Sequence, residues 1–122
     1  MKKLLWTLPT ILTIMACYDP STAAGGSSWT PSSSLIAEIE ATLKMPRNAF
    51  PLSAYARYFA GEVVNGRRIV VGVFLHDAKN SGTRIVNLEK MPQVLDGGCG
   101  VINLKYDVER KKVLAFFCNG DA

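Results

Sequence analysis

Residues 96–119 read D-G-G-C-G-V-I-N-L-K-Y-D-V-E-R-K-K-V-L-A-F-F-C-N, and this stretch decides how we expect the chain to fold. Two apolar runs of strand length flank a charged turn, a pattern typical of a β-hairpin. A cysteine lies near the open end of each run. Cys99 and Cys118 are at nearly equal distances from a turn centred between Val108 and Glu109. We therefore predict a disulfide that closes the base of the hairpin, with two reduced, buried cysteines as the alternative.

The charge of the chain is modest once its first residues are set aside. Its 122 residues suffice for one domain, with 14 Lys and Arg against 10 Asp and Glu, a formal net charge of +4. Without Lys2 and Lys3 the counts become 12 against 10. The cluster Arg110-Lys111-Lys112 falls in the predicted turn, where charge protects a strand edge from pairing. We therefore expect no nucleic-acid partner.

Residues 1–16 have the features of a signal peptide. Two lysines precede an apolar run, Leu4–Ala16, which is shorter than the roughly 20 residues of a membrane-spanning helix. The run ends in Ile14-Met15-Ala16-Cys17, which resembles the lipobox of bacterial lipoprotein precursors. The resemblance implies cleavage before Cys17, lipidation of that cysteine, and attachment to a membrane of the bacterial envelope.

Two other fates of the leader remain open: simple secretion with cleavage after Ala24, and a retained membrane segment. The cysteine count favours lipidation, because a lipidated Cys17 leaves Cys99 and Cys118 as a pair. In enterobacterial lipoproteins an aspartate directly after the cysteine favours the inner membrane. Here Tyr18 holds that position, so the resemblance implies the periplasmic face of the outer membrane.

Residues 17–31 are predicted to be the lipidated cysteine and a flexible tether. Gly, Ser, Thr and Pro dominate this segment, which has little to bury. Fourteen residues of such coil reach roughly 20 Å on average. Trp29 is the exception, and it either packs on the domain, which we favour, or rests at a membrane interface. Residues 32–122 then form the domain.

The domain should begin with a helix. Thr30 is predicted as the N-cap with Pro31 at the first helical position, and Ser34 is a competing cap. Pro46 should end the helix, and Glu40 can pair with Lys44 one turn on. An apolar stripe recurs at helical spacing: Leu35, Ile36, Ile39 and Leu43.

Another hairpin, the first along the chain, is predicted from Tyr55–Val64 and Arg67–Leu75, joined by Asn65-Gly66, the strongest short hairpin signal. A two-residue turn places Tyr55 opposite His76 and Phe59 opposite Gly72. We expect the more uniformly apolar face to pack on the helix. That face comprises Ala56, Tyr58, Ala60, Ile69, Val71, Val73 and Leu75.

The other face ends in a polar group, the candidate ligand-binding residues Tyr55, Arg57 and His76, with Asp77 next along the chain. A His-Asp pair beside an arginine can bind an anion or transfer a proton, although a structural cluster at a sheet end is the interpretation we favour. One histidine without a free cysteine or an acidic cluster makes a poor metal site. No motif places a serine nucleophile. We predict no metal, no cofactor and no catalytic residue.

Between the hairpins we expect a short strand over 83–87 and a helical turn over 88–95, broken by Pro92. The predicted fold is therefore α+β: one N-terminal helix packed on a mainly antiparallel sheet of about five strands, with one disulfide. Its outline resembles the cystatin-like arrangement, in which a meander sheet wraps a helix.

The expected function is that of a small cell-envelope lipoprotein, a non-enzymatic binding or accessory module with an envelope protein as partner. The alternative is a secreted hydrolase or enzyme inhibitor that uses Tyr55, Arg57 and His76. An enzyme should have a concave pocket into which His76 points, whereas a binding module should expose a sheet face or edge.

Overall fold

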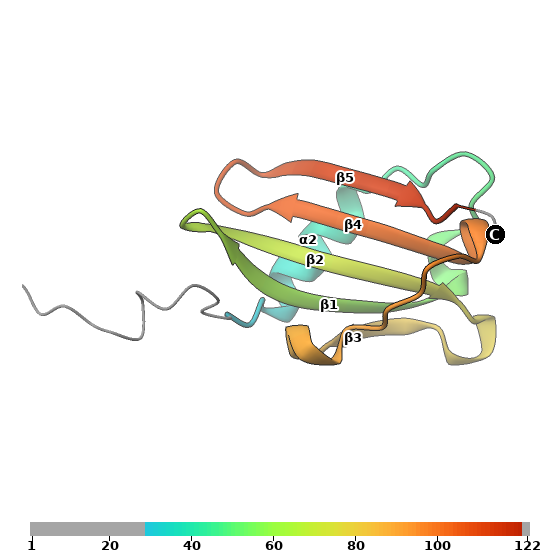
Figure 1. Cartoon of the computed structure of the whole chain (residues 1–122). Coiled ribbons are helices and arrows are strands. Elements are labelled where there is room, and N and C mark those ends of the chain that lie inside the picture. Colours follow the sequence, from blue (N-terminus) through green and yellow to red (C-terminus); the bar gives the residue numbers. More distant parts are fainter. Residues whose placement is uncertain (1–28, 121–122) are drawn as a thin grey trace, which may run out of the picture.

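One helix lies across a five-stranded mixed sheet in the computed structural model of the chain, which describes residues 29–120 (Figure 1). The predicted signal peptide, Cys17 and residues 18–28 of the predicted tether lie outside the described residues. The predicted α+β class is confirmed. The elements are α2 (Ser33–Thr42), β1 (Tyr55–Val64), β2 (Arg67–His76), β3 (Gly82–Ile85), β4 (Val101–Asp107) and β5 (Lys112–Cys118).

The sheet has the order β3-β1-β2-β4-β5, and only the β1–β3 pair is parallel. A simple meander was the wrong expectation, because β3 joins the free edge of β1 instead of lying between the hairpins. Parallel neighbours need a crossover connection. The chain after β3 therefore crosses the front of the sheet in Figure 1, on the face opposite α2, before it enters β4.

The helix begins two residues later than predicted. The N-cap is Ser32, whose hydroxyl accepts a hydrogen bond from the backbone N–H of Leu35 at 3.2 Å. Pro31 is buried just before the cap. Leu43 is already extended, so the helix ends at Thr42, four residues before Pro46.

The first hairpin has the predicted register. Tyr55 pairs with His76, Phe59 with Gly72, and Val64 with Arg67. Asn65 and Gly66 have φ of 50° and 75°, the left-handed values that a type I′ turn requires at both central positions. Local turn chemistry therefore aligns the two longest strands.

The prediction of which face packs on the helix is wrong. Ile36 and Ile39 of α2 join a core built from the opposite face, whose buried members are Tyr55, Phe59, Val70, Phe74, Ile102, Leu104 and Tyr106. The large aromatic side chains fill the space between helix and sheet, which small ones could not. The crossover lies over the other face, where Ala56 and Ala60 are buried.

The second hairpin forms, but with a longer turn than the symmetric two-residue loop. Asp107 pairs with Lys112, and a bulge lies between Lys105 and Tyr106 in the β4–β5 pairing. Cys118 pairs with Ile102 of β4, three residues beyond Cys99. The Gly98–Gly100 turn folds back to bring Cys99 to its partner. The predicted disulfide is confirmed, with the two Cα atoms 4.6 Å apart.

None of the helices within residues 29–120 has the length and apolar character needed to cross a bilayer.

Candidate functional site

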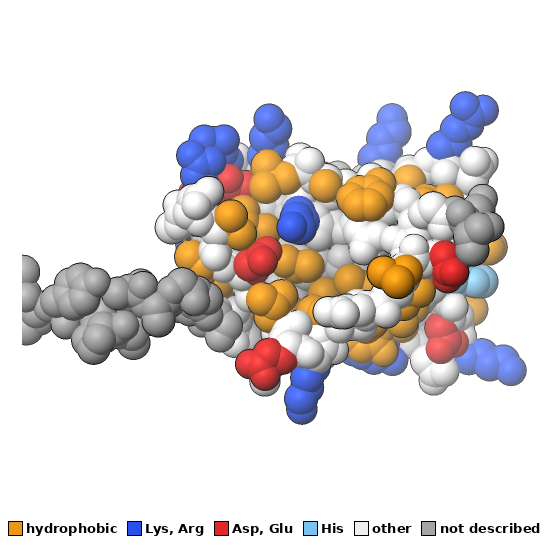
Figure 2. All heavy atoms as spheres, in the orientation of Figure 1, with side chains coloured by type: hydrophobic (Ala, Val, Ile, Leu, Met, Phe, Trp, Pro, Cys, Tyr) orange, Lys and Arg blue, Asp and Glu red, His pale blue; other side chains and the backbone are white. Residues whose placement is uncertain are grey.

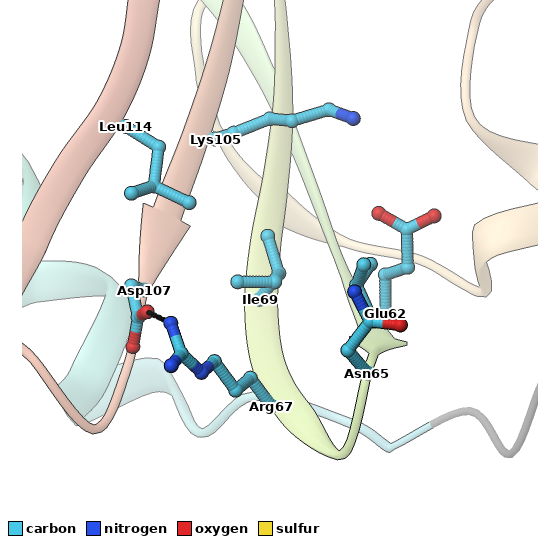
Figure 3. A pocket seen from close by; sticks show the side chains of 8 residues that line it. Glu62, Asn65, Arg67, Ile69, Lys105, Asp107 and Leu114 are labelled. Carbon is cyan, nitrogen blue, oxygen red and sulfur yellow. Dashed lines mark ion pairs between the residues drawn. The ribbon is translucent and has the colours of Figure 1, made fainter.

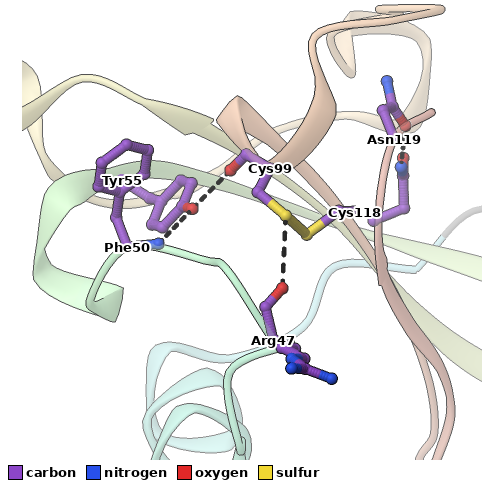
Figure 4. Close-up of a disulfide and its surroundings, with 7 residues drawn as sticks. Arg47, Phe50, Tyr55, Cys99, Cys118 and Asn119 are labelled. Atoms are coloured by element: carbon purple, nitrogen blue, oxygen red, sulfur yellow. Dashed lines mark hydrogen bonds between the residues drawn. A yellow bond between two sulfur atoms is a disulfide. The ribbon is translucent and has the colours of Figure 1, made fainter. Parts of the chain in front are cut away.

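Tyr55, the first predicted ligand-binding residue, is a structural link at the disulfide end of the sheet (Figure 4). Its side chain is fully buried. The Tyr55 hydroxyl donates a hydrogen bond to the carbonyl oxygen of Cys99 at 2.6 Å and accepts one from the backbone N–H of Phe50 at 3.0 Å. With donor and acceptor both used inside the protein, the hydroxyl is not free for a ligand.

Arg57, the second predicted ligand-binding residue, is held in place by Glu40 of α2. Its Nη2 lies 3.4 Å from Oε2 of Glu40, and both side chains are largely buried. Arg57 Nη1 donates to the carbonyl oxygen of Leu52 at 2.7 Å, and Thr83 donates to Glu40 Oε1 at 2.5 Å. Glu40, which we expected to pair with Lys44, instead joins α2 to β1 and β3.

His76 and Asp77 face different surroundings. The exposed His76 ring stacks on Phe50, with ring centroids 3.8 Å apart and an interplanar angle of 9°. The carboxylate of Asp77 accepts hydrogen bonds from the backbone and side-chain nitrogens of Asn80. The side-chain hydrogen bond lowers the pKa of Asp77 below its usual value. The four predicted residues thus share one end of the sheet, but they do not converge on a common point.

A hollow of about 500 Å³ lies at the other end of the sheet, on the face opposite α2 (Figure 3). Four charged residues line it together with apolar and amide side chains. The lining residues are Glu62, Val64, Asn65, Arg67, Ile69, Lys105, Asp107 and Leu114. Sequence reasoning missed this hollow, since it depends on the pairing of β2 with β4, which no local turn specifies.

Asp107 is a buried acidic residue in the wall of this hollow. Its carboxylate is 1% exposed, and Oδ2 lies 3.9 Å from both Arg67 Nη1 and Arg110 Nε. Asp107 Oδ1 accepts a hydrogen bond from the backbone N–H of Arg110 at 3.0 Å. Burial of a polar group costs free energy unless partners satisfy it. The contacts of the Asp107 side chain with Arg67 and Arg110 therefore hold the turn in place.

The same face carries exposed apolar side chains, which we call the exposed apolar face: Val64, Leu114 and Phe117. Their exposed fractions are 42%, 48% and 52%. Figure 2 shows hydrophobic side chains spread over this side of the molecule, between isolated charged groups. Leu114 and Phe117 belong to β5, which pairs only with β4 and therefore has a free edge. Edges and faces of this kind receive protein partners.

The β1–β2 and β4–β5 turns lie against each other beside this face. The backbone N–H of Val108 donates to the carbonyl oxygen of Arg68 at 3.1 Å, and Arg68 Nε donates to Glu109 Oε1 at 2.7 Å. That side-chain hydrogen bond lowers the pKa of the Glu109 carboxyl. Trp29 packs here, as favoured from the sequence, because its indole N–H donates to the carbonyl oxygen of Glu62 at 3.0 Å.

Within residues 29–120, no three His, Cys, Asp or Glu side chains are grouped so that they could hold a metal ion. Comparison of the chain with protein-family models, with curated proteins and with solved structures gave no match.

Proposed function

We propose that this chain is a lipid-anchored protein of the bacterial cell envelope whose domain binds a protein partner through the exposed apolar face, without catalysis. The observation that carries the binding role is the exposure of Val64, Leu114 and Phe117 together on one face beside a free strand edge. Aromatic and aliphatic side chains at the centre of an interface supply most of its binding energy.

The anchor is supported by the sequence Ile14-Met15-Ala16-Cys17 and by the disulfide. Disulfides persist in oxidising compartments such as the periplasm and are rare in the cytosol. The pairing of Cys99 with Cys118 leaves Cys17 as the remaining cysteine of the chain. A lipid on Cys17 accounts for all three.

The hydrolase or inhibitor alternative receives less support. The Tyr55 hydroxyl is hydrogen-bonded to the backbone, and the two Nη atoms of Arg57 contact the Leu52 carbonyl oxygen and Glu40. The hollow of about 500 Å³ lies at the opposite end of the sheet from His76. General acid–base catalysis requires the titrating group to be within hydrogen-bond reach of a bound substrate, and an exposed ring stacked on Phe50 lies on no wall of that hollow.

The anchor is tested by Cys17→Ser in cells supplied with radioactive palmitate. The wild-type protein should take up label and appear at the mature size, whereas the variant should remain an unlabelled precursor. Cys118→Ser is the control, because it also replaces a cysteine but leaves the lipobox intact; it breaks the disulfide with Cys99 and should still label with palmitate. Label that persists in Cys17→Ser would contradict the proposal.

The binding face is tested with a photo-crosslinking amino acid placed at Leu114 or Phe117. We expect a discrete adduct in intact cells from these positions and none from Ala37, an exposed residue of α2. Val64→Asp should reduce the yield at position 114, because a charge on the same face disfavours an apolar partner. Equal yields from positions 37 and 114 would contradict a specific binding face.

A further inference from the structure

The end of the sheet where Trp29 packs carries five basic residues, Arg67, Arg68, Arg110, Lys111 and Lys112, which we call the basic end. We infer that the basic end rests against anionic phospholipid headgroups and sets the orientation of the domain on the membrane. This inference builds on the proposed lipid anchor. It adds the surface that faces the bilayer and the class of headgroup.

Most of the excess positive charge of the described chain lies in the two turns at this end, beside which Glu62 adds one further acidic side chain. Residues 29–120 contain 12 Lys and Arg against 8 Asp and Glu, an excess of four. The two turns, residues 65–68 and 107–112, hold five basic and two acidic residues, which is three of that excess. The remaining described residues are nearly balanced, with seven basic against six acidic. Any attraction to a negatively charged surface therefore acts on this end.

The two acidic residues of the turns do not project as free charges. Asp107 is buried between Arg67 and Arg110, and Glu109 is hydrogen-bonded to Arg68. The three arginines remain about half exposed, with side-chain exposed fractions of 50%, 52% and 56%. Lys111 and Lys112 are exposed as well. The acidic residues thus fix the arginines in place while cations face outward.

The chain also enters the domain at this end. Trp29 is tied to the β1 carbonyl of Glu62, and the Arg68 guanidinium lies over its ring at 5.3 Å. A side chain on Gly61 would meet the carbonyl oxygen of Trp29 at 2.0 Å, so only glycine permits this close contact. The entry point of the tether is therefore built into the fold.

Eleven residues separate Cys17 from Trp29. Twelve Cα–Cα steps of about 3.3–3.6 Å limit the distance from Cys17 to Trp29 to about 40 Å at most, so the proposed anchor holds the basic end near the bilayer. Electrostatic attraction acts over roughly 8 Å at physiological salt. Each basic residue near an anionic membrane surface strengthens the partition of the protein from water onto the membrane by about fivefold. The anchor thus brings the basic end near the membrane, and the charges select the orientation.

This orientation leaves accessible the part of the proposed binding face that lies on β5, Leu114 and Phe117, while Val64 lies next to the Asn65-Gly66 turn. Strands β1 and β2 meet at the Asn65-Gly66 turn and run away from it to the end that holds the disulfide (Figure 1). With that turn at the bilayer, the long strands stand away from the membrane surface. Leu114 and Phe117 then face sideways, toward a partner in the same compartment.

Tryptophan fluorescence of the mature chain can be used to test the orientation of the domain. Trp29 is the one tryptophan left after removal of the leader, which contains Trp6. The acylated protein is inserted into vesicles of phosphatidylcholine alone or mixed with phosphatidylglycerol, each with a headgroup dye that accepts energy from tryptophan. We expect higher transfer from Trp29 on the anionic vesicles, and a loss of that gain in 1 M salt, where screening shortens to about 3 Å.

Two matched double variants separate the basic end from overall charge. Lys111→Asn with Lys112→Gln should reduce the gain in transfer on anionic vesicles, although Arg67, Arg68 and Arg110 remain. Arg47→Gln with Lys79→Gln removes two exposed charges near the disulfide end and should leave transfer unchanged. Equal transfer on both vesicle types, or equal losses in both double variants, would overturn the inference. A different outcome is equal transfer on both vesicle types together with binding of duplex DNA by the wild-type protein. If Lys111→Asn with Lys112→Gln abolished that DNA binding, the basic end would be assigned to nucleic acid.

A separate flotation experiment tests the proposed lipid anchor. If the mature chain isolated from cells carries no acyl groups, it will not float with phosphatidylcholine vesicles, and that result would contradict the proposed function. The same chain should still float with anionic vesicles, about 25-fold more weakly after Lys111→Asn with Lys112→Gln. Absence of any preference for anionic vesicles in that protein would overturn the basic-end inference itself.

Discussion

The hydroxyl of Tyr55 donates a hydrogen bond to the carbonyl oxygen of Cys99, 2.6 Å away and 44 residues along the chain. This contact joins the start of β1 to the turn that carries the disulfide. The same hydroxyl accepts the backbone N–H of Phe50. One buried side chain thereby connects the loop after the helix, the first hairpin and the base of the second.

Replacement of Tyr55 by Phe should destabilise the domain by about 1–3 kcal/mol, the cost of leaving buried hydrogen-bonding groups without partners. The midpoint of denaturant unfolding measures the effect. Tyr58→Phe is the matched control, because Tyr58 is only half buried and its ring stays under Arg84. Equal shifts in the two variants would contradict the structural role assigned to the Tyr55 hydroxyl.

The disulfide should be present in the mature protein as isolated. Mass spectrometry should find that neither Cys99 nor Cys118 is alkylated until a reductant is added. Joint replacement of both by Ala should lower the free energy of unfolding by about 3 kcal/mol, the loop-closure entropy for a separation of 19 residues. Alkylation of both thiols before reduction would show that the bond does not form in the cell.

Gly66→Val should destabilise the domain by at least about 1 kcal/mol, because a β-branched residue is strained at positive φ. Nothing lies within 4 Å of a Cβ at this position, so backbone strain alone is responsible. Gly66→Asn tests this cause, since asparagine tolerates left-handed geometry, and it should cost much less. If valine and asparagine have the same effect on the unfolding midpoint, strain in the turn is not the reason.

Glu40→Gln should cost about 1–3 kcal/mol, because it leaves the largely buried Arg57 guanidinium without its countercharge. Glu38→Gln is the matched control on the same helix. Glu38 is exposed, so its replacement should change stability by no more than about 0.5 kcal/mol. Thermal unfolding of both variants provides the comparison, and similar losses would mean that the Glu40–Arg57 pair contributes little.

The register of the first hairpin follows from the sequence alone. Asn65-Gly66 accepts positive φ at both turn positions, and the strict two-residue period then aligns every pair from Val64–Arg67 to Tyr55–His76. The disulfide was predictable for a related reason. Two cysteines at the ends of one hairpin remain neighbours even when its loop lengthens, and a glycine-rich turn lets the backbone bring Cys99 back to Cys118.

The position of the candidate site residues could be predicted from the sequence, but their contact partners could not. Pairing of Tyr55 with His76 placed the polar group at one end of the sheet, as predicted. The partners that occupy these side chains come from elsewhere in the chain: Phe50 for His76, Glu40 for Arg57 and Cys99 for Tyr55. Such contacts depend on how the helix, the loop after it and the Gly98–Gly100 turn pack against the sheet, which no local pattern encodes.

Local features follow from the order of residues: the turn, the strand period, the helical stripe and the paired cysteines. The face of the first hairpin that receives the helix does not, because both faces carry many apolar residues and the more uniformly apolar one is not the one with the larger side chains. The larger Phe59 and Phe74 fill the gap to Ile36 and Ile39, and the small Ala56 and Ala60 are left to the crossover. The position of β3 was decided in the same way, since an edge strand of four residues takes whichever free backbone edge the packed core leaves open.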